Sequence, residues 1–199
     1  MKSKTYAFGK IVKRYSIPLD EIEDLNTIYD KERKKLKNFG HRLAGRLKSE
    51  LDFTHLLQST KAFKTLTKCM NDYTMALNHL ALNNAISSNL NILSCWINDM
   101  KEGEYNPPHT HHNLTGMSTV LFLKVPEYIN EEKHPHKFKD GQLGFISTDG
   151  VACTWMDDIK VGDFFIFLAS HQHCVMPFKV KKKGEIRRSM SFNFINHVK

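Results

Sequence analysis

The chain has 199 residues, a formal net charge of +8, and hydrophobic and charged shares of 41% and 25%. This composition excludes a disordered chain, and the sequence has no apolar run near the ~18 residues of a membrane span and no apolar signal core. We therefore expect a cytoplasmic protein with no membrane partner, built as one domain over residues 1–199. Within it, residues 1–88 are expected to be mainly helical support and residues 89–197 the core.

Positive charge is concentrated in two segments, Lys31–Lys48 and Lys179–Arg188. A solvated helix face and a basic hairpin turn account for both. Nucleic-acid binding is the alternative, because clustered positive charge is typical of it, although no aromatic residues are interleaved with these charges. The four cysteines form no Cys-x-x-Cys pair, so we expect reduced, mostly buried thiols rather than disulfides or a zinc knuckle.

The sequence predicts helices in the first half of the chain. Residues 1–17 are expected to be irregular or to contain one short strand. Asp20 and Glu23 form a capping-box pattern that predicts the start of the first helix. Its apolar stripe is expected to break near residues 38–40 and then to resume. The stripe consists of Ile22, Leu25, Ile28 and Tyr29, followed by Leu43, Leu47 and Leu51.

A second helix is expected to begin near Ser59 or Thr60. Apolar residues recur from Phe63 to Asn84 at steps of three and four, which is helical spacing. Such stripes are more typical of core-facing helices than of a cofactor-binding segment. We expect both helices to cover one side of a sheet.

From Asn89 onward the pattern indicates strands. Residues 90–98 are apolar at odd and even positions, as in a strand covered on both faces. Shorter strands are expected at 117–125, 142–146, 151–156, 164–168, 173–180 and 186–195. Asp149-Gly150 predicts a hairpin, and residues 127–141 predict a mobile polar loop whose His134 and His136 are too exposed to be ligands. The expected fold class is α+β, with N-terminal helices packed on a jelly-roll or barrel-like sandwich.

Three histidines follow two prolines within residues 107–112. Side chains alternate between faces in an extended segment, so His109 and His111 point the same way and form two candidate metal ligands. A third ligand has to come from a distant strand, and His171 and His173 have the same parity. The spacing favours His173, which is closer to the strand that follows. Zinc hydratases, cupins and non-haem iron enzymes all fit this pattern.

The strand expected at 186–195 alternates in polarity. One face carries Arg187, Ser189, Ser191 and Asn193, and the other carries Ile186, Arg188, Met190, Phe192 and Phe194. Burying the first face without partners is costly. A bound dicarboxylate would supply partners, because the fork of Arg187 matches one carboxylate and the Ser189 hydroxyl adds a hydrogen bond. A polar face open to water is the alternative.

Four segments in order carry a family resemblance: Trp96-Ile97-Asn98, residues 103–111, Gly162-Asp163 ahead of His173–Phe178, and Arg187–Asn193. Together they resemble the Fe(II)/2-oxoglutarate-dependent oxygenases, most closely the small bacterial and phage-type members of the prolyl-hydroxylase-like branch. The resemblance covers roughly residues 90–195. It implies a double-stranded β-helix and a dioxygenase that hydroxylates a C–H bond, with Fe(II), 2-oxoglutarate and dioxygen as cofactor and cosubstrates.

The resemblance also implies roles for single residues. The implied iron ligands are His109, His111 and His173, and the implied cosubstrate ligands are Arg187, Ser189 and Asn98. The family pattern favours His173 over His171. It likewise favours Arg187 over Arg188 as the anchor for 2-oxoglutarate, and gives Asn98 the other carboxylate. No side-chain general base is required.

Two positions depart from the family pattern. Most of the superfamily has a carboxylate where this chain has His111, and three neutral ligands leave the centre with one more positive charge. The close subgroup shares this histidine, so we interpret it as a variant of the site. Phe122 stands where a tyrosine often contacts 2-oxoglutarate, so that contact is missing or replaced.

Two other functions use the same histidines. A zinc hydrolase or hydratase would leave the polar row of Arg187 unexplained. A cupin-like metal-binding module without enzymatic activity would bind metal but not turn over 2-oxoglutarate. For the oxygenase, the resemblance favours a protein side chain such as proline as primary substrate, the basic segments favour nucleic acid, and a small metabolite comes third. The loops 127–141 and 181–184 would flank the mouth of the site and influence this choice.

Overall fold

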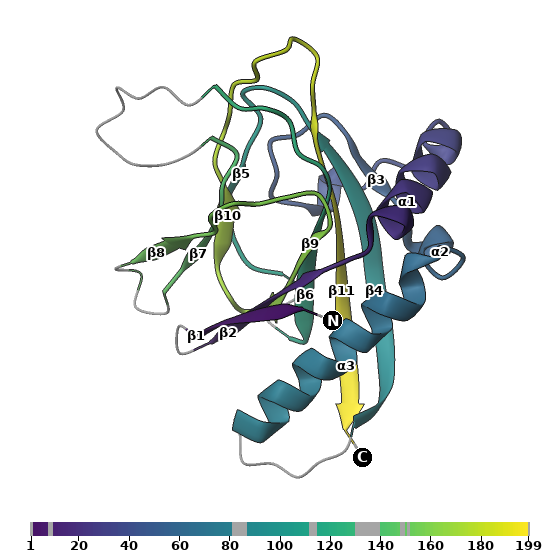
Figure 1. The fold of residues 1–199 in the computed structure, drawn as a ribbon, viewed down its shortest axis with the longest axis vertical. Helices are drawn as coiled ribbons and strands as arrows, with labels where there is room; N and C mark the ends of the chain where they lie inside the picture. The colour runs from purple at the N-terminus through teal and green to yellow at the C-terminus, as the bar shows by residue number, and fades with distance from the viewer. Residues whose placement is uncertain are drawn as a thin grey trace.

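The computed structural model describes residues 2–7, 10–80, 87–111, 115–129, 140–147, 150 and 152–198. Its helices are α1 (Leu19–Glu32), α2 (Thr54–Leu57), α3 (Ala62–Leu80) and the short 3-10 helix η1 (Gly40–Arg42) (Figure 1). Its strands are β1 (Ser3–Ala7), β2 (Ile11–Ser16), β3 (Glu50–Asp52), β4 (Ser87–Met100), β5 (Asn106–His109), β6 (Met117–Lys124), β7 (Leu143–Ile146), β8 (Cys153–Trp155), β9 (Asp163–Leu168), β10 (His173–Val175) and β11 (Arg187–Val198).

The strands form two antiparallel sheets (Figure 1). The larger has the order β1-β2-β9-β6-β11-β4-β3, and the smaller has the order β5-β10-β7-β8. An apolar layer that includes Phe122, Phe145 and Phe167 lies between strands of the two sheets. This is a double-stranded β-helix accompanied by helices, so the predicted α+β jelly-roll class is confirmed.

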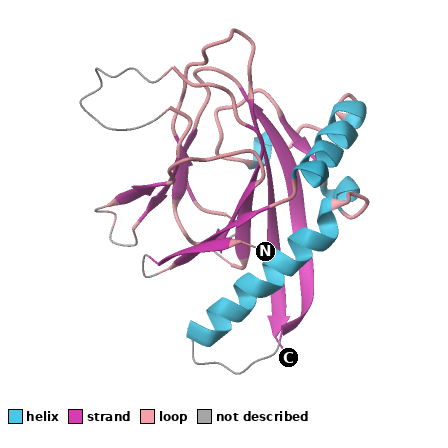
Figure 2. Cartoon of the chain, in the orientation of Figure 1, coloured by secondary structure: helices cyan, strands magenta, loops and turns pink. Residues whose placement is uncertain are grey.

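Helices α1 and α3 lie against the outer face of the larger sheet (Figure 2). Leu25 of α1 and Leu66 of α3 are fully buried in one cluster with Phe192 of β11. A sheet face covered in this way needs apolar side chains at every second position, and β11 supplies them with Met190 and Phe194. The odd-numbered positions of β11 consequently point between the two sheets, where the site lies.

The N-terminal region contributes strands as well as helices. Strand β2, in the segment expected to be irregular or to contain one short strand, pairs with β9. Strand β3, in a segment expected to be helical, pairs with β4 and extends the other side of the larger sheet. The resumed helical stripe was a wrong prediction, because α1 ends at Glu32 and Leu51 lies in β3. Asn38 Oδ1 accepts a hydrogen bond from the Gly40 N–H at 2.7 Å, which turns the chain toward the sheet edge.

The start of α1 also differs from the prediction. Pro18 is the N-cap residue and no side chain caps the helix, so Asp20 and Glu23 do not form a capping box. The preset φ of proline serves this entrance without one. Helix α3 ends at Leu80, and Asn84 falls outside the described residues. None of the helices in the described part of the chain has the length and apolarity needed to span a membrane.

All four cysteines are free thiols. Cys69, Cys95 and Cys174 are buried, and Cys153 is partly buried. The thiols are therefore mostly buried, as predicted.

Candidate metal centre and cosubstrate cavity

Three histidines converge at the edge of the smaller sheet. His109 ends β5, His173 begins β10, and the two residues are paired in register. His111 follows two residues later, and its Nε2 lies 3.0 Å from Nε2 of His173. One ring nitrogen of each histidine lies within 4.8 Å of the others. This spacing suits a single metal ion, since imidazole nitrogens bind metals at about 2.1 Å.

The three imidazoles are prepared for a metal. Burial lowers the pKa of His109, lowers the pKa of His111 to about 3, and lowers the pKa of His173 well below its ordinary value. Nδ1–H of His109 donates to the Pro107 carbonyl at 2.7 Å, and Nδ1–H of His173 donates to the His171 carbonyl at 3.0 Å. These bonds leave Nε2 of both rings unprotonated. Neutral imidazole donors of this kind fit Fe(II).

His171 lies in the turn between β9 and β10, outside the cluster of three histidines found among the described residues. Its ring is buried against Phe145, with the ring centroids 5.1 Å apart. Its backbone carbonyl, rather than its ring, supports His173. The structure thus brings His173, and not His171, to His109 and His111.

An aromatic stack fixes the orientation of His111. The ring of Trp96 on β4 stacks on His111 with centroids 5.6 Å apart, and Phe39 stacks on Trp96 at 5.7 Å. On the other side of the cluster, Phe167 meets His173 edge-on at 4.7 Å. Rings held by packing in this way bind a metal without a large loss of side-chain freedom.

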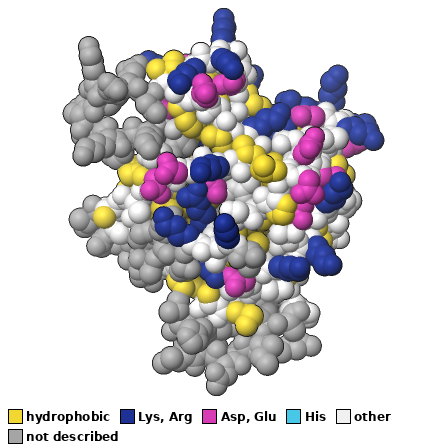
Figure 3. Space-filling model, viewed as in Figure 1, with side chains coloured by type: hydrophobic (Ala, Val, Ile, Leu, Met, Phe, Trp, Pro, Cys, Tyr) yellow, Lys and Arg dark blue, Asp and Glu magenta, His cyan; other side chains and the backbone are white. Residues whose placement is uncertain are grey.

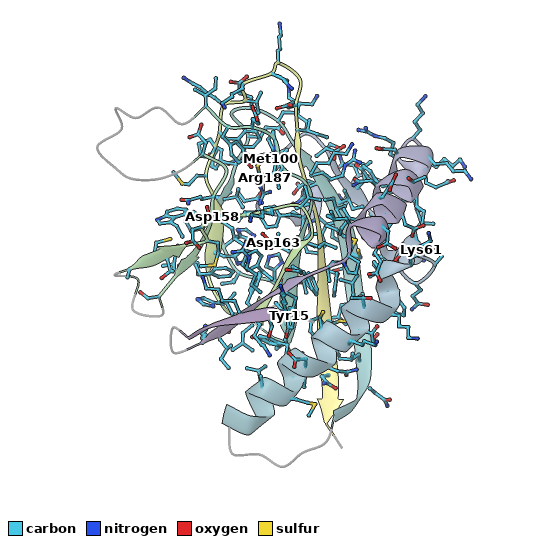
Figure 4. The ribbon with its side chains drawn as sticks, in the orientation of Figure 1. Tyr15, Lys61, Met100, Asp158, Asp163 and Arg187 are labelled. Atoms are coloured by element: carbon cyan, nitrogen blue, oxygen red, sulfur yellow. The ribbon has the colours of Figure 1, made fainter. Side chains whose placement is uncertain are left out.

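Arg187 lies between the two sheets, opposite Met100 on the neighbouring strand (Figure 4). Its side chain is 1% exposed and lies over the Phe122 ring, 4.5 Å from guanidinium carbon to centroid. Nη1 donates a long 3.4 Å hydrogen bond to Ser189 Oγ, while Nε and Nη2 have no partner among the described residues. Burial lowers the pKa of Arg187. A buried guanidinium with two free donors is costly unless an anion binds it.

Arg188 is the opposite case. Its Nε donates to Asp99 Oδ1 at 2.6 Å, and its Nη2 donates to Asp30 Oδ1 at 2.8 Å. Nη1 donates to Asn26 Oδ1 at 2.9 Å. The guanidinium is therefore fully used in joining β11 to α1 and β4, and has no capacity for a ligand.

One cavity of about 410 Å³, counted with its open mouth, connects the histidines with Arg187. Asn98 and Ser189 line it side by side, since they are paired in register on β4 and β11. Within the described ranges, Asn98 Oδ1 is buried and has no hydrogen-bond partner. The structure therefore places all six predicted site residues around a single cavity.

Two further residues of this region were missed by the sequence analysis. Tyr128 lies in the expected polar loop, and its hydroxyl is close enough to Arg187 to raise the pKa of the guanidinium against the effect of burial. Glu50 lies in the segment wrongly predicted as helix and lines the cavity. Predicting a strand at this segment would have placed Glu50 beside the site. Nothing in the sequence around Tyr128 indicates its approach to Arg187.

Some of the predicted loops and turns fall partly or wholly outside the described residues. His134 and His136 and most of the 127–141 loop fall outside the described residues, as does Asp149. Strands β7 and β8 do pair as the expected hairpin, and the Ser147 N–H donates to the Ala152 carbonyl at 2.8 Å. The turn 181–184 is exposed to solvent.

A family model for 2OG-Fe(II) oxygenases matches residues 94–193, which include all six site residues. No curated protein sequence matches the chain.

Solved structures share this fold at low sequence identity. A prolyl-4-hydroxylase from Pseudomonas putida aligns with a TM-score of 0.59 and 19% identity over 92% of this chain and 91% of that one. A viral collagen prolyl hydroxylase from Paramecium bursaria Chlorella virus-1, solved with 2-oxoglutarate, gives 0.59 and 13% over 92% and 94%. A Trichoplax adhaerens prolyl hydroxylase, solved with a hypoxia inducible factor peptide, gives 0.58 and 12% over 92% and 83%.

Proposed function

This chain belongs to the 2OG-Fe(II) oxygenase family, and we propose that its iron is bound by His109, His111 and His173. As a member of the family it is an Fe(II)- and 2-oxoglutarate-dependent dioxygenase. The observation that carries the assignment of residues is a buried, unmatched guanidinium in the same cavity as three neutral imidazoles.

When bound, iron and 2-oxoglutarate supply the oxidative decarboxylation of 2-oxoglutarate by dioxygen and the coupled hydroxylation of a C–H bond. The residues of the chain bind and orient these two groups and shield them from solvent. Arg187 would hold one carboxylate of 2-oxoglutarate through Nε and Nη2, and Ser189 would add a hydroxyl. Asn98, in register with Ser189, would bind the other carboxylate.

Tyr128 supplies the phenol that Phe122 lacks. Phe122 contributes only its ring face, on which the Arg187 guanidinium rests. Tyr128 approaches the same guanidinium from beyond β6 and is held edge-on against Phe178, with the centroids 5.3 Å apart. A carboxylate on Arg187 would therefore lie within reach of a hydroxyl from a residue outside the strand that carries Phe122.

The competing functions lack support. A zinc hydrolase would have no use for a dicarboxylate anchor, and a cupin-like binding module leaves the family match unexplained. We retain the oxygenase alone.

We propose a protein side chain as the primary substrate. The support is the shared fold with three prolyl hydroxylases, one of which was solved with a peptide. Nucleic acid is less favoured, because Lys and Arg side chains on the face shown in Figure 3 are interspersed with Asp and Glu rather than forming a continuous stripe.

An anaerobic titration with Fe(II) and 2-oxoglutarate tests the proposal. Chelation of iron by 2-oxoglutarate gives a visible charge-transfer band, which the wild type should show and Arg187→Ala should show only at about 10- to 100-fold higher 2-oxoglutarate. Lys183→Ala, in the exposed turn, is the control and should match the wild type. Absence of the band in the wild type, or an unchanged titration in Arg187→Ala, contradicts the assignment.

A further inference from the structure

The cavity contains a buried carboxylate that the proposed cofactor site does not use. Glu50 is 2% exposed and lines the cavity from β3. Its backbone is paired in register with Asn98, which is paired in turn with Ser189. Glu50 is thus two strands away from β11, about 10 Å across the sheet. Arg187 and Glu50 give the two sides of the cavity opposite charge.

A second acceptor oxygen lies beside Glu50. Glu50 Oε1 is 2.9 Å from the position that a Cβ on Gly45 would occupy, and Asn106 Oδ1 would overlap the same position. The two oxygens therefore converge beneath Gly45, where only glycine leaves room. Asn106 Oδ1 is buried without a hydrogen-bond partner within the described part of the chain, and so is the other carboxylate oxygen of Glu50, Oε2, which lies on the Gly40 side.

A buried carboxylate and a buried amide oxygen that lack donors are costly, and acceptor oxygens that lie close together repel one another. A group that donates N–H bonds and carries positive charge removes both penalties, since a charged donor bonds a carboxylate about twice as strongly as a neutral one. Burial, and then the nearby Glu104 carboxylate, raise the pKa of Glu50 to about 7. No described cation forms an ion pair with Glu50 that would offset this effect.

We propose that Glu50 and Asn106 form a subsite for a cationic nitrogen of the primary substrate, an alkylammonium or a guanidinium. The inference rests on the proposed function and deepens it, because it assigns a peptide substrate with a basic residue at or beside the hydroxylated position. It also excludes a phosphate at this side of the cavity, where Glu50 and Glu104 would repel it.

The subsite can be tested with small probes by calorimetry at pH 8. The probes are n-butylammonium and methylguanidinium, and 1-butanol is the uncharged counterpart of the first. We expect the wild type to bind a charged probe at least tenfold more tightly than 1-butanol, and Glu50→Gln to lose that difference. Asn106→Asp should bind the cations more tightly, and Glu23→Gln, which alters an exposed carboxylate on α1, should match the wild type. The tighter cation identifies ammonium or guanidinium as the natural group.

The outcomes are independent of the cofactor assignment. Calorimetry uses metal-free protein, and the Fe(II)/2-oxoglutarate band is recorded separately for the wild type and Glu50→Gln. If both proteins show the band but neither discriminates charged from uncharged probes, the subsite is refuted. If charged probes bind as expected but the band is missing from the wild type, the cofactor assignment fails while the cation subsite stands.

Discussion

Arg187 and Arg188 are adjacent in the chain, yet their guanidinium groups lie on opposite faces of β11 in opposite states of pairing. Arg188 bonds Asp99 at 2.6 Å on the helix-covered face, whereas Arg187 keeps two unpaired donors on the cavity face. Strand alternation separates the two side chains, and their partners decide their roles. One arginine holds the fold together, and the other is available to a ligand.

Replacing each arginine should separate stability from binding. Arg188→Ala leaves the buried Asp99 with only the partly exposed Arg33 as a cationic partner, so the free energy of unfolding should fall by about 3 kcal/mol. Arg187→Ala removes a buried, unmatched charge and should leave that free energy unchanged or raise it. Urea denaturation of both variants in the absence of 2-oxoglutarate measures this. Equal destabilisation of the two variants would contradict the division of roles.

The two candidate distal histidines should differ in metal affinity. His173→Ala removes one of three ligand nitrogens and should weaken metal binding by more than the ~10- to 100-fold typical of lost supporting contacts. His171→Ala should retain near wild-type affinity, because only its backbone carbonyl supports the site. Calorimetric titration with Fe(II) under anaerobic conditions gives both values. The reverse ranking would identify His171 as the ligand.

Tyr128→Phe should weaken 2-oxoglutarate binding without abolishing it. Loss of one hydrogen bond to a charged carboxylate corresponds to about 1.5–3 kcal/mol, or roughly a 10- to 150-fold higher dissociation constant. The charge-transfer band should therefore still form at saturating 2-oxoglutarate. Tyr105→Phe, at an exposed tyrosine, is the matched control. If Tyr128→Phe binds 2-oxoglutarate as tightly as the wild type, the Tyr128 hydroxyl does not replace the tyrosine hydroxyl that is missing at Phe122.

Glu50 should make stability depend on pH. Its pKa is raised from 4.5 to about 7 in the folded protein, so between these values the folded state binds more protons than the unfolded state. The contribution of Glu50 to stability consequently falls as pH rises from about 4.5 to 7, by on the order of 3 kcal/mol, and is level above 7. Glu50→Gln should remove this fall and be the more stable protein at pH 8. Parallel pH profiles of urea denaturation for the two proteins would contradict it.

The sequence by itself determined much of the fold and the parts of the site that depend on alternation. The strand spacing after Asn89 indicated the jelly roll, and His109, His111 and the polar row beginning at Arg187 follow from the two-residue period of a strand. Helical spacing failed at Leu43–Leu51, because leucines at four-residue steps there fall in a turn and in an edge strand paired to β4.

Only the tertiary structure decided which of several residues with equivalent sequence patterns enters the site. His171 and His173 have the same parity, and the pairing of β10 with β5 places His173 at the cluster. Asp99 and Asp30 pair with Arg188 and not with Arg187. Glu50 reaches the cavity from a distant segment, and Tyr128 reaches Arg187 from another. The physical reason is that local periodicity fixes the face on which a side chain lies. Its charge partner and its burial depend on strand register and on contacts between residues far apart in the chain.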